Sequence, residues 1–170
     1  MSALRETLLA RLDEFDGKAI TILGEIEAAF GQEDGFLSEM AALADHPQAN
    51  IADGATWLVK SALDNGGSLS AEDTAILLAH LPDGASWGAQ LHVCQCIGRL
   101  ELSPDQLAML VQWLEPILAH QRPFLRAWSL DALWALARLD PALRDRAEAA
   151  RKTALEDDAA SVRARARNLA

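Results

Sequence analysis

The sequence predicts an all-α protein built from short antiparallel helical hairpins, and three observations support this. Alanine and leucine dominate the 170 residues, Tyr is absent, and Val and Ile are sparse, so helix formers prevail over strand formers. Apolar residues recur near the helical period of 3.6 residues. Short sequence segments also repeat along the chain, which is typical of stacked structural units.

Helix start and stop signals divide the chain into ten predicted helices. Ser103-Pro104-Asp105-Gln106 reads as a capping box, Asp140-Pro141 repeats this start signal, and Ser70 opens a weaker version. Because the linkers are short, successive helices should pack as antiparallel neighbours. The predicted ranges are 2–15, 17–30, 35–45, 54–65, 71–81, 86–100, 104–119, 123–139, 141–156 and 160–169.

Two pairs of similar segments define the boundaries of the predicted repeats. Asp53-Gly54-Ala55-Thr56-Trp57 recurs 30 residues later as Asp83-Gly84-Ala85-Ser86-Trp87, which predicts equivalent packing roles for Trp57 and Trp87. Residues 120–126 align with residues 157–163, a shift of 37. Turn starts are therefore predicted at positions 53, 83, 120 and 157. We expect a single domain over 1–170, with 1–35 as N-terminal capping helices and 36–170 as about four hairpin repeats.

The last two repeats carry a recognisable pattern, in which a turn residue is followed by an aliphatic residue and Arg. It reads Asp157 with Val162-Arg163, and His120 with Leu125-Arg126. In this the chain resembles the HEAT-like (armadillo-type) helical repeat family over residues 36–170, most strongly in the last 70. The resemblance implies a right-handed α-α superhelix, or solenoid, and says little about function.

Turn acids and arginines are expected to form a structural ladder. A turn carboxylate can accept backbone N–H groups at the start of the second helix. Arg126 and Arg163 can reach the turn of a neighbouring unit and pair with its acid. The predicted ladder residues are Asp53, Asp83, His120, Arg126, Asp157 and Arg163.

Charge and cysteine content exclude several classes of partner and site. The net charge is −10. Residues 1–85 carry −11 and would repel duplex DNA and anionic membranes, whereas residues 86–170 carry +1 and offer no strong basic stripe, so we expect neither kind of partner. Cys94 and Cys96 cannot bridge each other on a helix, which is typical of a reducing compartment, and Cys94 falls on an apolar face. His92 and Cys96 lack a third ligand nearby, so we expect no metal and no cofactor. We expect a cytoplasmic protein, because the N-terminal pattern is amphipathic and unlike a signal peptide.

A partner-binding face is predicted on the helix over 123–139. Leu125, Ser129, Ala132, Leu136 and Leu139 form its core stripe on a helical wheel. Trp134 lies opposite with Asp131 and Arg138, and exposed Trp and Arg are typical interface residues. The alternative is that Trp134 packs under a neighbouring helix. His92 and Arg99, on a polar stripe of the preceding second helix, complete the predicted partner-binding set.

The absence of catalytic motifs favours a non-catalytic protein-interaction module. The sequence has no Gly-rich phosphate loop, no Gly-x-Ser-x-Gly elbow and no His-Glu-x-x-His. The expected partner is a protein or peptide, and a homodimer is also expected because the last helix has no polar capping unit. The alternative is a DNA alkylation-repair-type glycosylase of similar fold, which the net charge disfavours despite Trp128, Asp131 and Trp134. A HEAT-like bilin lyase is a third reading that no particular residue supports.

Overall fold

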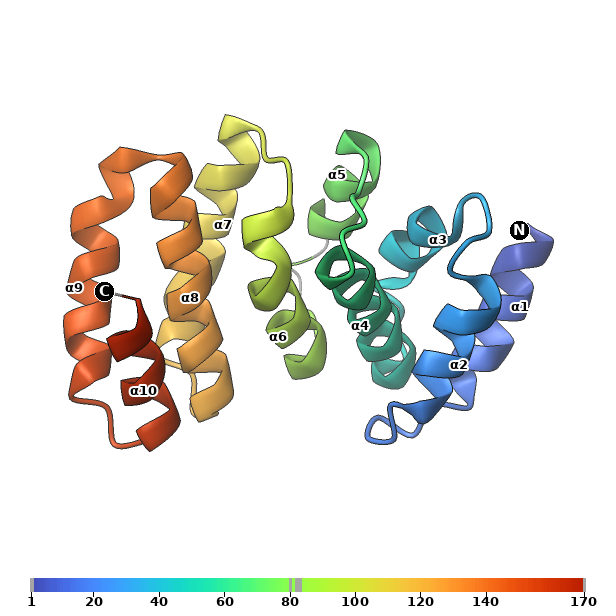
Figure 1. Ribbon diagram of the computed structural model, residues 1–170, viewed down its shortest axis with the longest axis horizontal. Coiled ribbons are helices and arrows are strands. Elements are labelled where there is room, and N and C mark those ends of the chain that lie inside the picture. The colour runs from blue at the N-terminus through green and yellow to red at the C-terminus, as the bar shows by residue number, and fades with distance from the viewer. Residues whose placement is uncertain (1, 80, 82–83, 170) are drawn as a thin grey trace. The chain divides into compact units, whose positions relative to one another are not determined.

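The computed structural model describes residues 2–79, 81 and 84–169. Within these residues there are ten α-helices and no strand, so the all-α prediction is confirmed (Figure 1). None of the described helices is both long enough and apolar enough to cross a membrane. The helices are α1 (Ala3–Asp13), α2 (Thr21–Phe30), α3 (Phe36–Leu43), α4 (Ala49–Asp64), α5 (Ala71–Ala79), α6 (Trp87–Cys96), α7 (Pro104–Leu118), α8 (Pro123–Leu139), α9 (Arg144–Leu155) and α10 (Ala160–Asn168), with short 3-10 helices η2 (Ile97–Arg99) and η3 (Pro141–Leu143).

The chain divides into two compact units, residues 1–92 and 93–170. In the first unit α4 packs against α1, α2 and α3, and α3 also contacts α5. The first unit's core is formed by fully buried aliphatic side chains, among them Leu8, Leu12, Leu23, Ile26, Met40 and Leu58. Stacking of all hairpins into one superhelix stays a prediction.

Helix α8 is the centre of the second unit and contacts α7, α9 and α10. Its buried stripe includes Leu125, Ser129, Ala132 and Leu136, as the helical wheel predicts. The wheel also predicts Leu139 on this stripe, but Leu139 is the last residue of α8 and is 57% exposed, so this part of the prediction is wrong. The core of this unit therefore ends one turn before α8 does.

The residues of the predicted helix start signals form local hydrogen bonds with backbone amides. The Ser103 hydroxyl accepts from the Gln106 amide at 3.2 Å, and the Gln106 side chain accepts from the Ser103 amide at 2.8 Å, so the capping box is present. The Asp140 carboxylate accepts from the Ala142 amide at 3.0 Å and opens η3, which then runs into α9. These contacts satisfy amide groups that have no partner inside their helices.

Three inter-helix turns share one hydrogen-bond geometry. In each, a side chain accepts a hydrogen bond from the backbone amide two residues later, immediately before a helix begins. The pairs are His46 Nδ1 with the Gln48 amide (3.2 Å), His120 Nδ1 with the Arg122 amide (3.0 Å), and Asp157 Oδ1 with the Ala159 amide (2.8 Å). Imidazole and carboxylate groups are therefore interchangeable at this position.

These turns correct the predicted repeat register. Position 120 is 37 residues before 157, and position 46 is twice that distance before 120. Asp83 falls on the same spacing but lies outside the described residues. The predicted turn start at Asp53 is wrong, because α4 begins at Ala49 and Asp53 lies inside it. The first turn of the series is at His46.

Asp53 instead links two helices of the first unit. Its carboxylate accepts from the Ser86 hydroxyl and, at 2.9 Å, from the Ala89 amide in the first turn of α6. Gly88 permits this approach, since a Cβ there would lie 2.6 Å from the Asp53 carboxylate. Trp57 is half-buried within α4, whereas Trp87 begins α6 and is 47% exposed. The predicted equivalence of the two tryptophans is therefore wrong.

Arg126 joins successive turns of the second unit. Its Nε and Nη2 atoms donate to the two carboxylate oxygens of Asp157, both at 2.8 Å, and Nη1 donates to the His120 carbonyl at 2.8 Å. Hydrogen bonding from Arg126 lowers the pKa of Asp157. Arg163, in contrast, donates to the carbonyls of its own turn, Asp157 and Asp158.

Replacing Arg126 should show that this fork contributes stability through its geometry as well as its charge. We expect Arg126→Ala to lower the free energy of unfolding by about 2 kcal/mol, since charged hydrogen bonds of a largely buried pair are lost. Arg126→Lys keeps the charge but not the bidentate fork, so it should recover only part of that loss. Urea denaturation of the full chain measures both, with the exposed Arg167→Lys as control. Full stability in Arg126→Lys would contradict a geometric role.

Candidate functional site

A cleft of about 290 Å³ opens in the second unit between the end of α8 and the start of α9. Its floor is mostly small and apolar, apart from one large aromatic ring, and its only charged lining groups are two guanidinium groups. The lining residues are Trp134, Ala137, Arg138, Pro141, Arg144 and Ala147. Two of these residues, Trp134 and Arg138, belong to the partner-binding set predicted from the sequence.

The Trp134 ring is held on one side and open on another. It is half-buried, and the guanidinium carbon of Arg151 lies 6.0 Å from its ring centroid, at the outer limit of a cation–π contact. Arg151 is itself held by Glu148, with Nη2 and Oε1 2.9 Å apart. Hydrogen bonding from Arg151 lowers the pKa of Glu148. Trp134 thus packs against a neighbouring helix and also lines the cleft.

Arg138 and Arg144 are exposed, and within the described residues neither makes an ion pair or a hydrogen bond through its side chain. Arg138 lies in the last turn of α8, where the helix dipole favours a cation. Arg144 is the first residue of α9, where the dipole disfavours a cation. Helix stability therefore accounts for the charge of Arg138 and gives no reason for that of Arg144.

Asp131 lies outside the cleft, in a contact between α8 and α10. Its Oδ1 atom accepts from Arg165 Nη1 at 3.2 Å, and the same guanidinium group lies 3.8 Å from the ring centroid of Trp128. This arrangement combines an ion pair with a cation–π contact. The structure thus separates Asp131 from Trp134 and Arg138, although the three residues share one face of the helical wheel.

His92 and Arg99 also lie outside the cleft lining. The His92 ring nitrogen Nδ1 lies 3.0 Å from the Thr56 hydroxyl, which joins α6 to α4 within the first unit. Burial, with a smaller contribution from the Lys60 charge, lowers the pKa of His92 from 6.5 to about 4. Arg99 Nη1 donates to the carbonyl of Gln95 at 3.2 Å. Of the predicted set, Trp134 and Arg138 both line this cleft, and the other three residues do not.

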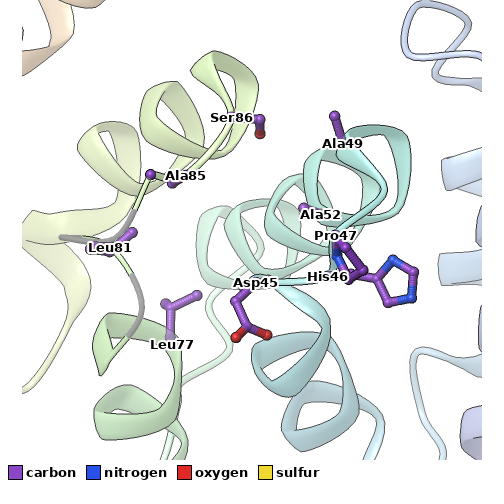
Figure 2. Close-up of a pocket in the computed structure, with 11 residues that line it drawn as sticks. Asp45, His46, Pro47, Ala49, Ala52, Leu77, Leu81, Ala85 and Ser86 are labelled. Atoms are coloured by element: carbon purple, nitrogen blue, oxygen red, sulfur yellow. The ribbon is translucent and has the colours of Figure 1, made fainter.

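The first unit contains a cavity of about 370 Å³ between the α3–α4 turn, the end of α5 and residues 84–86. Among the lining residues that the structure describes, Asp45, His46 and Ser86 are polar. Figure 2 shows the Asp45 carboxylate and the His46 ring pointing in different directions, so the two are not arranged as an acid–base pair. The Nδ1 atom of His46 already accepts from the Gln48 amide. The other lining residues are Ala44, Pro47, Ala49, Ala52, Leu77, Leu81, Gly84 and Ala85.

Groups that commonly bind metals or act as nucleophiles are dispersed in the described part of the chain. No three His, Cys, Asp or Glu side chains come together there in a way that could hold a metal ion. Cys94 and Cys96 are both buried, 2% and 1% exposed, and neither is in a disulfide. Burial raises the pKa of Cys94, which keeps it a protonated, unreactive thiol.

Comparison with known proteins gave no match. No family model, no curated protein and no solved structure is similar enough to this chain to support an inference.

Residue Arg144 is the part of the cleft that the sequence did not reveal. It begins α9, whereas the predicted binding face was drawn on α8 alone. The signal for this pairing in the sequence is two arginines six residues apart, with an Asp-Pro turn between them. They come together only because α9 folds back on α8.

His92 should make stability depend on pH in a defined window. Its pKa is lower in the folded chain than in the unfolded chain, so the unfolded chain binds a proton first as the pH falls. The contribution is fully present above about pH 6.5 and is lost between about pH 6.5 and pH 4, by about 3 kcal/mol in total. Urea denaturation at several pH values should show this slope in the natural chain and a flatter one in His92→Gln. Equal slopes would contradict the assignment.

Proposed function

We propose that this protein is a non-catalytic interaction module that binds a protein or peptide partner at the cleft lined by Trp134 and Arg138. The observation that supports this proposal is the placement of an aromatic ring beside unpaired guanidinium groups in a cavity between two packed helices. Trp and Arg are the residues most often responsible for binding energy at protein interfaces. Trp134 is half-buried beside Arg151 before a partner arrives, which reduces the entropy cost of ordering this anchor on binding.

The HEAT-like architecture belongs to the same proposal. Support comes from the three turns with a shared acceptor at His46, His120 and Asp157, and from the Arg126 fork that joins two of them. Stacked helical hairpins present extended surfaces to partners. We also propose a reducing compartment such as the cytoplasm, because Cys94 and Cys96 lie two positions apart near the end of α6, where they cannot form a disulfide with each other.

The alternative, a DNA alkylation-repair-type glycosylase, has less support. Such an enzyme would need a free carboxylate near Trp128 and Trp134, and Asp131 is paired with Arg165. A net charge of −10 also opposes binding to the phosphate backbone. A mobility-shift assay with duplex DNA at low salt separates the two, because tight binding would favour the glycosylase.

Replacing the two predicted anchors should remove partner binding while leaving the fold intact. We expect proteins that co-purify with the natural chain to be lost with Trp134→Ala/Arg138→Ala, because both side chains line the cleft and the partner would lose its contacts with them. The matched control is Phe124→Ala/Arg167→Ala, which removes an exposed aromatic ring and an exposed cation elsewhere in the same unit. Quantitative mass spectrometry of the captured proteins gives the comparison. Light scattering reports whether the partner is a second copy.

Equal capture by both double variants would remove this cleft as the binding site. Circular dichroism and a thermal melt of each variant ensure that loss of capture does not reflect unfolding.

A further inference from the structure

Two arginines of the second unit, Arg138 and Arg144, line the cleft among mostly apolar residues. Within the described residues, neither side chain has a partner. Four other arginines of this unit are matched with carboxylates. Arg138 and Arg144 approach the same cavity from two helices, and no acidic side chain lines it. The four matched arginines are Arg126 (with Asp157), Arg146 (with Glu115), Arg151 (with Glu148) and Arg165 (with Asp131).

Two guanidinium groups at one cavity constitute an anion-binding arrangement. Each offers a planar set of donors that fits a carboxylate in a bidentate geometry. The remaining lining is apolar and includes the Trp134 ring. A ligand whose anionic group pairs with the arginines would therefore also contact this apolar surface. The ligand that satisfies both parts of the lining has a carboxylate next to a large apolar group.

The size of the cleft limits what it can take. At about 290 Å³ it lies at the lower end of ligand-binding cavities, which run from about 300 to 1,000 Å³. It has room for one or two side chains of a peptide and is small for a nucleotide cofactor. A peptide also provides carboxylates and large apolar groups as adjacent side chains.

The charge around the cleft favours a short acidic segment over a polyanion as the ligand. Nucleic acids and anionic membranes bind to extended basic surfaces, and residues 86–170, which hold the cleft, carry a net charge of only +1. A short segment with one or two carboxylates needs only the local pairing that Arg138 and Arg144 offer. The favoured ligand is therefore a peptide segment.

Resting on the proposed interaction function, we infer that the cleft binds an acidic–hydrophobic peptide segment: an Asp or Glu side chain pairs with Arg138 and Arg144, and an adjacent large apolar side chain packs on Trp134. Arg144 is then a binding residue, which accounts for a cation at the N-terminal end of α9.

The probe is a library of random ten-residue peptides displayed on phage, selected on the full chain at physiological salt. We expect enriched sequences to pair Asp or Glu with a large apolar residue within a few positions. An enriched peptide, made synthetically, should bind at least tenfold more weakly to Arg138→Glu/Arg144→Glu than to the natural chain. The same loss is expected when its acid is replaced by the matching amide. Arg167→Glu is the matched control and should bind as the natural chain does.

Other outcomes overturn the inference and are separable from failure of the proposed function. Enriched peptides that lack an acid, or that bind Arg138→Glu/Arg144→Glu unchanged, would overturn the acidic-ligand assignment while a binding function stands. Binding to phosphatidylserine vesicles that depends on Arg138 and Arg144, without peptide enrichment, would also overturn it. If no peptide is enriched, the inference fails, and the co-purification comparison with Trp134→Ala/Arg138→Ala decides the proposed function on its own.

Discussion

The fork between Arg126 and Asp157 is the charged contact that joins successive turns of the second unit. It ties the start of α8 to the turn between α9 and α10, while Asp140 caps the connection at the opposite end of α8. The α8–α9 hairpin is therefore held by polar contacts at both ends, with buried aliphatic residues between them. Because both ends are held, the backbone at Trp134 and Arg138 on α8 keeps a defined position relative to the backbone at Arg144 on α9.

The helical architecture could be predicted from sequence because its signals are local. Capping residues, turn residues and apolar spacing act within a few positions, and the structure contains ten helices close to the predicted ranges in the described residues. The predicted repeat register is wrong because it relies on recurring residue types. Asp53 begins a recurring segment, but what marks a turn is an acceptor two residues before a helix, and the imidazole of His46 provides it there. The repeat is therefore defined better by the hydrogen-bond acceptor at the turn than by the type of residue that provides it.

The candidate site could be predicted only in the part that one helix contributes. A helical wheel placed Trp134 and Arg138 on an outward face, and both line the cleft. The same wheel added Asp131, which pairs with Arg165, 34 residues later in the chain. It also omitted Arg144, which belongs to the next helix. Contacts between helices depend on how the hairpins pack, and a wheel drawn for one helix has no information about this packing.

Charge at two length scales explains how an acidic protein could select an acidic segment. At long range, residues 86–170 add little attraction for a polyanion, because their net charge is only +1. At short range, the attraction is set by Arg138 and Arg144 and does not grow as the ligand gains further negative charge. Under the proposal, added acids beyond one or two gain no further pairing, whereas an apolar neighbour that packs on Trp134 strengthens binding. The same two arginines on a basic chain would lack this discrimination, because the long-range field would attract any anion.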